Sequence, residues 1–123
     1  MVLNYCQYTK YKNIRLIGKS LGAVVAAAYL KSLSLKQIKK FSILIFGYDI
    51  GYIDIKKFSG KIVIVQGSKD KFGDIKAVKR DMKGAVSKDI TYLSIEGADH
   101  SYRIPETKEP IYENKAIVAA FKQ

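Results

Sequence analysis

The stretch from Asn13 to Leu30 constrains the fold more than any other. A short apolar run, Ile14 to Ile17, meets Gly18-Lys-Ser-Leu-Gly22, and an alanine-rich run that favours a helix begins at once. Glycines that flank the serine lack a Cβ, so they allow a tight turn and a close approach of neighbouring elements. The pattern predicts a strand over 14–17 and a helix over 20–33, with Ser20 at the positive end of that helix.

Further apolar runs continue the same alternation along the chain. They predict strands over 41–47, 61–66 and 89–95, a helix capped by Asp74 that stops at Gly84, and a last helix that opens at Pro110. Strands that are apolar throughout and alternate with helices indicate a parallel sheet covered on both faces. We therefore expect one α/β domain over residues 1–123, with about four parallel strands and helices on both faces.

Two helices carry specific packing predictions. Nearly every residue from 21 to 30 is apolar, so we expect the first helix to be the most buried one. In the last helix, we expect Ile117, Val118 and Phe121 to face inward.

The chain is strongly basic, with a formal net charge of +11. A basic surface attracts nucleic acid or acidic membranes. However, only three of the 22 basic residues are arginines, namely Arg15, Arg80 and Arg103, and the lysines are scattered along the chain. Arginine makes most directed contacts to phosphates and bases. A solvated lysine surface is the simpler interpretation, and no specific nucleic-acid partner is expected.

Other classes of protein are excluded by what the chain contains. No apolar run approaches the length of roughly 18 residues that a membrane span needs, and the first residues lack the order of a secretion signal. We therefore expect a cytoplasmic protein without a membrane span. One cysteine, Cys6, and one histidine, His100, are too few for a four-ligand zinc site. Neither a metal nor another cofactor is expected.

Three polar residues follow three of the predicted strands. Ser20 comes after the first strand, Asp70 after the third and His100 after the fourth. The carboxyl ends of parallel strands meet at one edge of a sheet, where ligands bind. These side chains are therefore expected at a common rim. Asp49, Asp74 and Asp99 remain alternatives for the carboxylate, although Asp74 also reads as a helix cap.

The segment Gly18-Lys-Ser20 also suggests a phosphate-binding loop, which has the pattern G-x-x-x-x-G-K-[ST]. Asn13 stands where the first glycine of that pattern belongs, and the four residues between belong to the predicted strand. A strand cannot cradle a phosphate, so this interpretation is disfavoured.

Three segments of the chain resemble those of the α/β-hydrolase superfamily, and of its small dienelactone-hydrolase-like serine hydrolases in particular. Gly18-Lys-Ser-Leu-Gly22 is similar to the nucleophile elbow, Val65-Gln-Gly-Ser-Lys-Asp-Lys-Phe-Gly73 to the acid turn, and Gly97-Ala-Asp-His-Ser-Tyr102 to the histidine loop. The order Ser, Asp, His is also that of this superfamily. The resemblance implies a serine esterase that works through an acyl-enzyme.

Each role that the resemblance implies has a physical reason. His100 would take the proton of the Ser20 hydroxyl, because its unperturbed pKa suits a base near neutrality. Asp70 would fix the tautomer of the ring, and the backbone N–H of Leu21 would donate to the oxyanion. The short connection after the second strand leaves no room for a lid. We expect an open site for small acyl esters, with binding residues that comprise Lys19, Tyr48, Tyr52, Phe72 and Tyr102.

The chain departs from the superfamily in one large respect. A complete member has strands before the elbow, which here follows the first strand, and the loop that supplies the second oxyanion donor is missing with them. The same gap exposes the strand over 14–17, and open edges invite pairing. We expect a homodimer or higher oligomer that covers this strand, with residues 1–12 contributing. The alternative is a catalytically degenerate remnant that serves as a non-enzymatic interaction domain.

Overall fold

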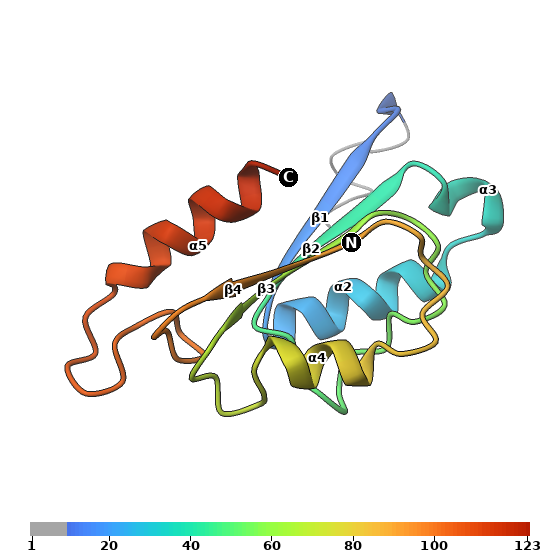
Figure 1. Ribbon diagram of the computed structural model, residues 1–123. Helices are drawn as coiled ribbons and strands as arrows, with labels where there is room; N and C mark the ends of the chain where they lie inside the picture. The colour runs from blue at the N-terminus through green and yellow to red at the C-terminus, as the bar shows by residue number, and fades with distance from the viewer. Residues whose placement is uncertain (1–9) are drawn as a thin grey trace.

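A four-stranded parallel sheet forms the centre of the protein (Figure 1). The computed structural model describes residues 10–123. The strands pair in the order in which they occur in the chain. They are β1 (Ile14–Lys19), β2 (Phe41–Phe46), β3 (Ile62–Gly67) and β4 (Ile90–Ile95). The predicted α/β class with four parallel strands is confirmed.

Helices cover both faces of the sheet, as predicted. Figure 1 shows α2 (Leu21–Ser32) and α4 (Ile75–Asp81) on one face and α5 (Ile111–Phe121) on the other. The cap predicted for α4 is present, since the Asp74 side chain accepts a hydrogen bond from the N–H of Ala77. A short helix, α3 (Leu35–Ile38), was not predicted; it begins with a capping box of Ser34 and Gln37.

The core lies on both sides of the two central strands. β3 is buried along its whole length, and β2 is buried at every position except Ser42. Side chains alternate along a strand, so the two faces receive different residues. Ile43, Ile45, Ile62 and Ile64 pack toward α2 and α4. Leu44, Val63 and Val65 pack toward α5.

Helix α2 has three buried residues, more than α3, α4 or α5, so the prediction that it is the most buried helix is confirmed, although it is not buried on all sides. Only Ala23, Ala27 and Leu30 are buried, whereas Leu21 is 72% exposed and Val25 is 61% exposed. The reason is that α2 packs against β1 and β2, and β1 is an edge strand whose Ile17 is itself 52% exposed. One flank of the helix therefore has no neighbour among residues 10–123.

The prediction that Ile117, Val118 and Phe121 of α5 face inward is wrong. Ile117, Val118 and Phe121 are all about half exposed, and the buried residues are Ala116 and Ala120. These alanines are four residues apart and share one face of the helix. Their small side chains let the helix lie close to the sheet, which turns its larger apolar residues outward.

Nothing in the described part of the chain is suited to cross a bilayer, since no helix there is both long and apolar enough. The prediction that residues 1–12 contribute to an oligomer falls largely on residues 1–9, which include Cys6 and lie outside the described residues.

Truncation of the central sheet should be costly. Ile64 is fully buried on β3, so Ile64→Ala is expected to lower the free energy of unfolding by roughly 2–5 kcal/mol, through lost burial and the cavity left behind. Leu35→Ala is the control, because Leu35 is 85% exposed, and it should change stability by less than about 0.5 kcal/mol. Urea denaturation followed by circular dichroism measures both. Equal midpoints for the two variants would contradict the described core.

Candidate active site

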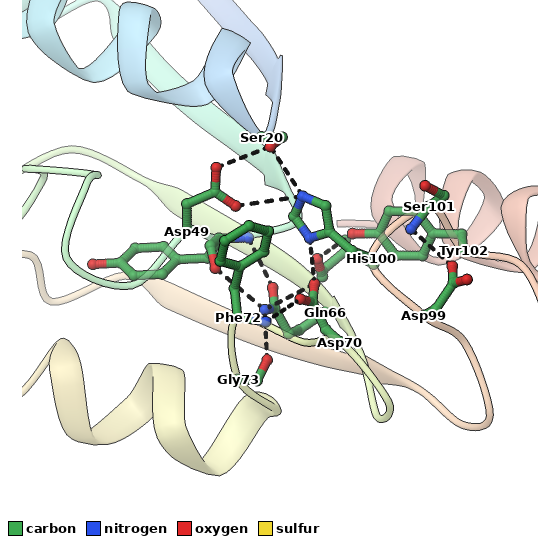
Figure 2. A network of polar contacts seen from close by, with 12 residues as sticks. Ser20, Asp49, Gln66, Asp70, Phe72, Gly73, Asp99, His100, Ser101 and Tyr102 are labelled. Carbon is green, nitrogen blue, oxygen red and sulfur yellow. Dashed lines mark hydrogen bonds and ion pairs between the residues drawn. The ribbon is translucent and has the colours of Figure 1, made fainter. Parts of the chain in front are cut away.

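Each strand of the sheet delivers one polar side chain to the same edge (Figure 2). Ser20 follows β1, Asp49 follows β2, Asp70 follows β3 and His100 follows β4. Because the strands are parallel, their carboxyl ends are neighbours, and residues up to 80 positions apart come into hydrogen-bond contact. The structure thus brings together the three residues that the sequence singled out, and adds Asp49.

The turn between β1 and α2 holds Ser20 in a strained conformation. Its φ is 50° and its ψ is −117°, a region that residues with a side chain rarely adopt. The N–H of Ser20 donates to the carbonyl of Phe46, which ties the turn to β2. A Cβ on Gly18 would lie 2.5 Å from the Cα of Ala23, so only glycine fits there. A Cβ on Gly22 would meet nothing within 4 Å, so the predicted close approach does not apply at Gly22.

The imidazole of His100 lies between a hydroxyl and a carboxylate. Nε2 is 2.9 Å from Ser20 Oγ, and Nδ1 is 2.7 Å from Asp70 Oδ2. A carboxylate can only accept, so Nδ1 carries the hydrogen and the lone pair of Nε2 faces the serine in the neutral ring. Phe72 packs against the ring edge-on at 4.7 Å between centroids. A Cβ on Gly47 would lie 2.8 Å from Cε1 of His100, so a glycine there makes room for the ring.

The carboxylate of Asp70 is completely buried and is held from several sides. Oδ1 accepts from the N–H of Phe72, and Oδ2 accepts from Nε2 of Gln66 as well as from His100. These donors fix the orientation of the carboxylate that in turn orients the histidine.

Gln66 is a functional residue that the sequence analysis missed. It is fully buried near the end of β3, where its Nε2 donates toward Asp70 and the carbonyls of Tyr48 and Gly73. Its Oε1 accepts from the N–H of Tyr48. The sequence does contain a signal for it: one amide side chain follows an apolar, β-branched run at the end of the strand. Because a buried polar group needs hydrogen-bond partners, such a residue indicates a polar network nearby.

The alternative carboxylates have different surroundings. Asp74 caps α4, and Asp99 accepts from the N–H groups of Ser101 and Arg103 within its own loop. Asp49 does enter the site, but on the other side of the ring from Asp70. Its Oδ2 is 2.9 Å from Ser20 Oγ, and its Oδ1 is 3.4 Å from Nε2 of His100.

The residues predicted to bind substrate are distributed differently. Tyr48 was expected in the wall of the site; it is instead fully buried, and its hydroxyl donates to Asp81 on the side of α4. Burial and this hydrogen bond raise the pKa of the Tyr48 hydroxyl far above its usual value. Phe72 does lie against His100, whereas Tyr52 is 70% exposed and has no described contact with the site.

Tyr102 and Lys19 line a separate groove. The Tyr102 hydroxyl donates to the carbonyl of Val65, its ring packs on Phe46, and burial raises the pKa of the phenol. The ammonium of Lys19 lies 5.7 Å from the centroid of the Tyr102 ring. Both residues border a cavity of about 320 Å³ that residues of α5 also line. Tyr102 is therefore mainly a packing residue.

A second groove, of about 330 Å³, reaches the histidine itself. It is lined by residues from the β3–α4 and β4–α5 loops: Lys69, Lys71, Asp99, His100, Ser101, Pro105 and Lys108. This lining has three lysines and one carboxylate, that of Asp99, and Lys69 is paired with Glu106. Among residues 10–123, no cluster of histidine, cysteine and carboxylate side chains has the size needed to hold a metal ion.

Comparisons with known proteins agree with this architecture. The family described as alpha/beta hydrolase domain matches residues 2–122. Among solved structures, an alpha-beta serine hydrolase homologue from Coxiella burnetii is similar, with a TM-score of 0.67 and 18% identity over 98% of this chain and 52% of the other. A predicted CIB-like hydrolase from Thermoplasma acidophilum gives a TM-score of 0.63 and 18% identity over 98% and 55%. The chain thus spans about half the length of these proteins. No curated protein matches significantly.

Replacement of Gln66 should loosen both the fold and the site. Gln66→Leu leaves the buried N–H of Tyr48 without its partner and removes one of the three donors to the carboxylate of Asp70, and an unsatisfied buried group costs roughly 1–3 kcal/mol. We expect a lower free energy of unfolding in urea denaturation. Gln123→Leu, at the exposed end of the chain, is the control and should change stability by less than about 0.5 kcal/mol. Wild-type stability of Gln66→Leu would contradict this role.

Proposed function

Because the chain belongs to the alpha/beta hydrolase domain family, we propose that it is a serine hydrolase that cleaves small acyl esters through an acyl-enzyme on Ser20. One observation carries the proposal. His100 lies 2.9 Å from Ser20 Oγ through Nε2 and 2.7 Å from Asp70 Oδ2 through Nδ1. This is the arrangement that a serine, a base and an orienting acid require.

The residues divide the chemistry as follows. Nε2 of His100 takes the hydroxyl proton as Ser20 Oγ attacks the ester carbonyl, and it later gives that proton to the departing alkoxide. Asp70 holds the ring in the required tautomer and stabilises the imidazolium that forms. Water then cleaves the acyl-enzyme with His100 as the base.

Charge that develops on the carbonyl oxygen needs hydrogen-bond donors. The first N–H groups of a helix have no acceptor within the helix, and the N–H of Leu21 opens α2 directly after Ser20. We assign it as one oxyanion donor. Loss of one donor in a well-studied protease lowers kcat roughly 10²- to 10³-fold, so with Leu21 alone the described chain should turn over slowly.

The surroundings favour small, accessible esters. The β2–β3 connection contains turns and irregular backbone but no helix or strand, and the groove beside His100 opens to solvent. Phe72 provides an apolar surface against the ring, and Lys69 and Lys71 flank the groove. Small acyl groups on good leaving groups should react fastest, because such substrates need little positioning beyond the reacting atoms.

A fluorophosphonate probe tests the nucleophile. Wild-type protein is expected to be labelled on Ser20, and Ser20→Ala to lose labelling entirely. Asp70→Asn should reduce hydrolysis of p-nitrophenyl acetate strongly, since the equivalent change in a serine protease costs on the order of 10⁴-fold. Ser59→Ala, at an exposed serine, is the control and should react as wild type does. Labelling that persists in Ser20→Ala would overturn the assignment.

A non-enzymatic interaction domain is the second candidate. The observation in its favour is that the chain spans about half of its structural neighbours. Esterase activity of the wild type no higher than that of Ser20→Ala would favour this function instead.

We also propose that two or more copies associate over the open side of β1. Three large apolar residues there, Ile17, Leu21 and Val25, are more than half exposed. Light scattering at micromolar concentration should report a dimer or larger assembly, and Val25→Lys should shift it toward monomer, because a buried unpaired charge is unfavourable. Leu35→Lys, on α3, is the control and should not. A wild-type monomer would refute association.

A further inference from the structure

Asp49 is a buried carboxylate in the site for which the mechanism above has no use. The residue is 7% exposed, and it follows β2 by three positions. Its backbone carbonyl accepts from the N–H groups of Tyr52 and Ile53, so its main chain is held by a turn. Its side chain points at the reacting groups: Oδ2 is 2.9 Å from Ser20 Oγ, and Oδ1 is 3.4 Å from Nε2 of His100 (Figure 2).

One carboxylate oxygen has no hydrogen bond. Oδ1 of Asp49 is buried and has no hydrogen-bond partner among residues 10–123. Burial of a charged group without full pairing is unfavourable. Stability of the resting fold therefore does not explain the presence of this carboxylate.

Acylation of Ser20 does not explain it either. The serine hydroxyl has one hydrogen and two acceptors at 2.9 Å, which are Nε2 of His100 and Oδ2 of Asp49. A hydrogen bond to Asp49 directs that hydrogen away from the base. In the resting enzyme the two acceptors compete.

The balance changes once Ser20 is acylated. Its oxygen then has no hydrogen, so Asp49 and Nε2 of His100 both lose their common donor. Two acceptors 3.4 Å apart then face one place beside the acyl carbon. A water molecule carries two O–H donors, so it can donate one hydrogen bond to each member of this pair.

We propose that Asp49 is a catalytic residue of the second half-reaction, in which it binds and orients the water that cleaves the acyl-enzyme. This inference rests on the proposed function. One O–H of the water donates to Nε2 of His100 and the other to Asp49, so a lone pair of the oxygen is directed at the acyl carbon.

The proton and bond changes balance without another reactant. The water oxygen bonds to the acyl carbon while Nε2 takes one proton of the water. The π electrons of the acyl carbonyl move to the carbonyl oxygen. When the carbonyl re-forms, the C–O bond to Ser20 breaks, its electron pair stays on Oγ, and Oγ takes the proton from Nε2. The second hydrogen of the water leaves on the carboxylic acid product. Asp49 only accepts a hydrogen bond throughout.

The test compares acylation and deacylation in Asp49→Ala and Asp49→Asn. Each protein is mixed with p-nitrophenyl acetate, and intact mass spectrometry follows the gain and loss of one acetyl group. Both variants should acylate at least as fast as wild type, because competition for the serine hydrogen is removed or weakened. Asp49→Ala should lose the acetyl group roughly 10- to 100-fold more slowly, as expected for a lost hydrogen bond to a charged group. Asp49→Asn should be slowed less, since an amide oxygen is a weaker acceptor.

Controls separate this role from structure. Asp54→Asn makes the same charge change in the same loop at an exposed side chain that pairs with Lys31, and it should deacylate as wild type does. Thermal unfolding of both Asp49 variants should occur at or above the wild-type temperature, because an incompletely paired buried carboxylate is removed. A structural role for Asp49 predicts lower stability and slows both half-reactions, which would overturn the proposal.

The two proposals fail in different ways. If Ser20 carries the acetyl group and both Asp49 variants release it at the wild-type rate, the role of Asp49 is refuted while the serine hydrolase stands. If wild type acquires no acetyl group, or Ser20→Ala acquires as much, the proposed function is refuted and the role of Asp49 with it.

Discussion

Parallel pairing of the strands in chain order is the constraint on which the site depends. Each crossover returns the chain to the same end of the sheet, so the loops after β1, β2, β3 and β4 all lie at one edge. Each loop contributes one polar side chain, namely Ser20, Asp49, Asp70 or His100. Burial of the two central strands, β2 and β3, holds this edge of the sheet in place.

The site contains strained and closely packed backbone that is unfavourable in itself and is held in place by the surrounding fold. Ser20 adopts a strained backbone conformation, and Gly18 and Gly47 leave space that a Cβ would fill. Gln66 satisfies the polar groups around Asp70 in the interior. Strain of this kind persists only where neighbouring structure holds it, and here the neighbours are the fully buried ends of the central strands.

The exposed side of β1 accounts for an apolar surface shared by β1 and α2. It leaves Ile17 on β1 and Leu21 and Val25 on α2 in contact with solvent. The similar solved structures are about twice as long, and this chain matches about half of each. Among residues 10–123, β1 is an edge strand of the sheet, and the N–H of Leu21 is the one oxyanion donor that we assign.

Local patterns in the sequence determined the elements: apolar runs predicted all four strands, and Asp74 predicted the start of α4, because these signals act over a few residues. The sequence also placed Ser20, Asp70 and His100 after their strands, and the parallel topology brings these positions to a common edge.

Packing between distant segments decided the rest. Because of this packing, alanines form the inner face of α5, and Tyr48 is buried with its hydroxyl bonded to Asp81. Gln66 donates a hydrogen bond to Asp70 for the same reason. The resemblance implied that Asp70 holds the ring, but only the tertiary structure shows that Asp49 lies near it as well, on the side of Nε2. Side-chain directions in separate loops decide this, and no local pattern encodes them.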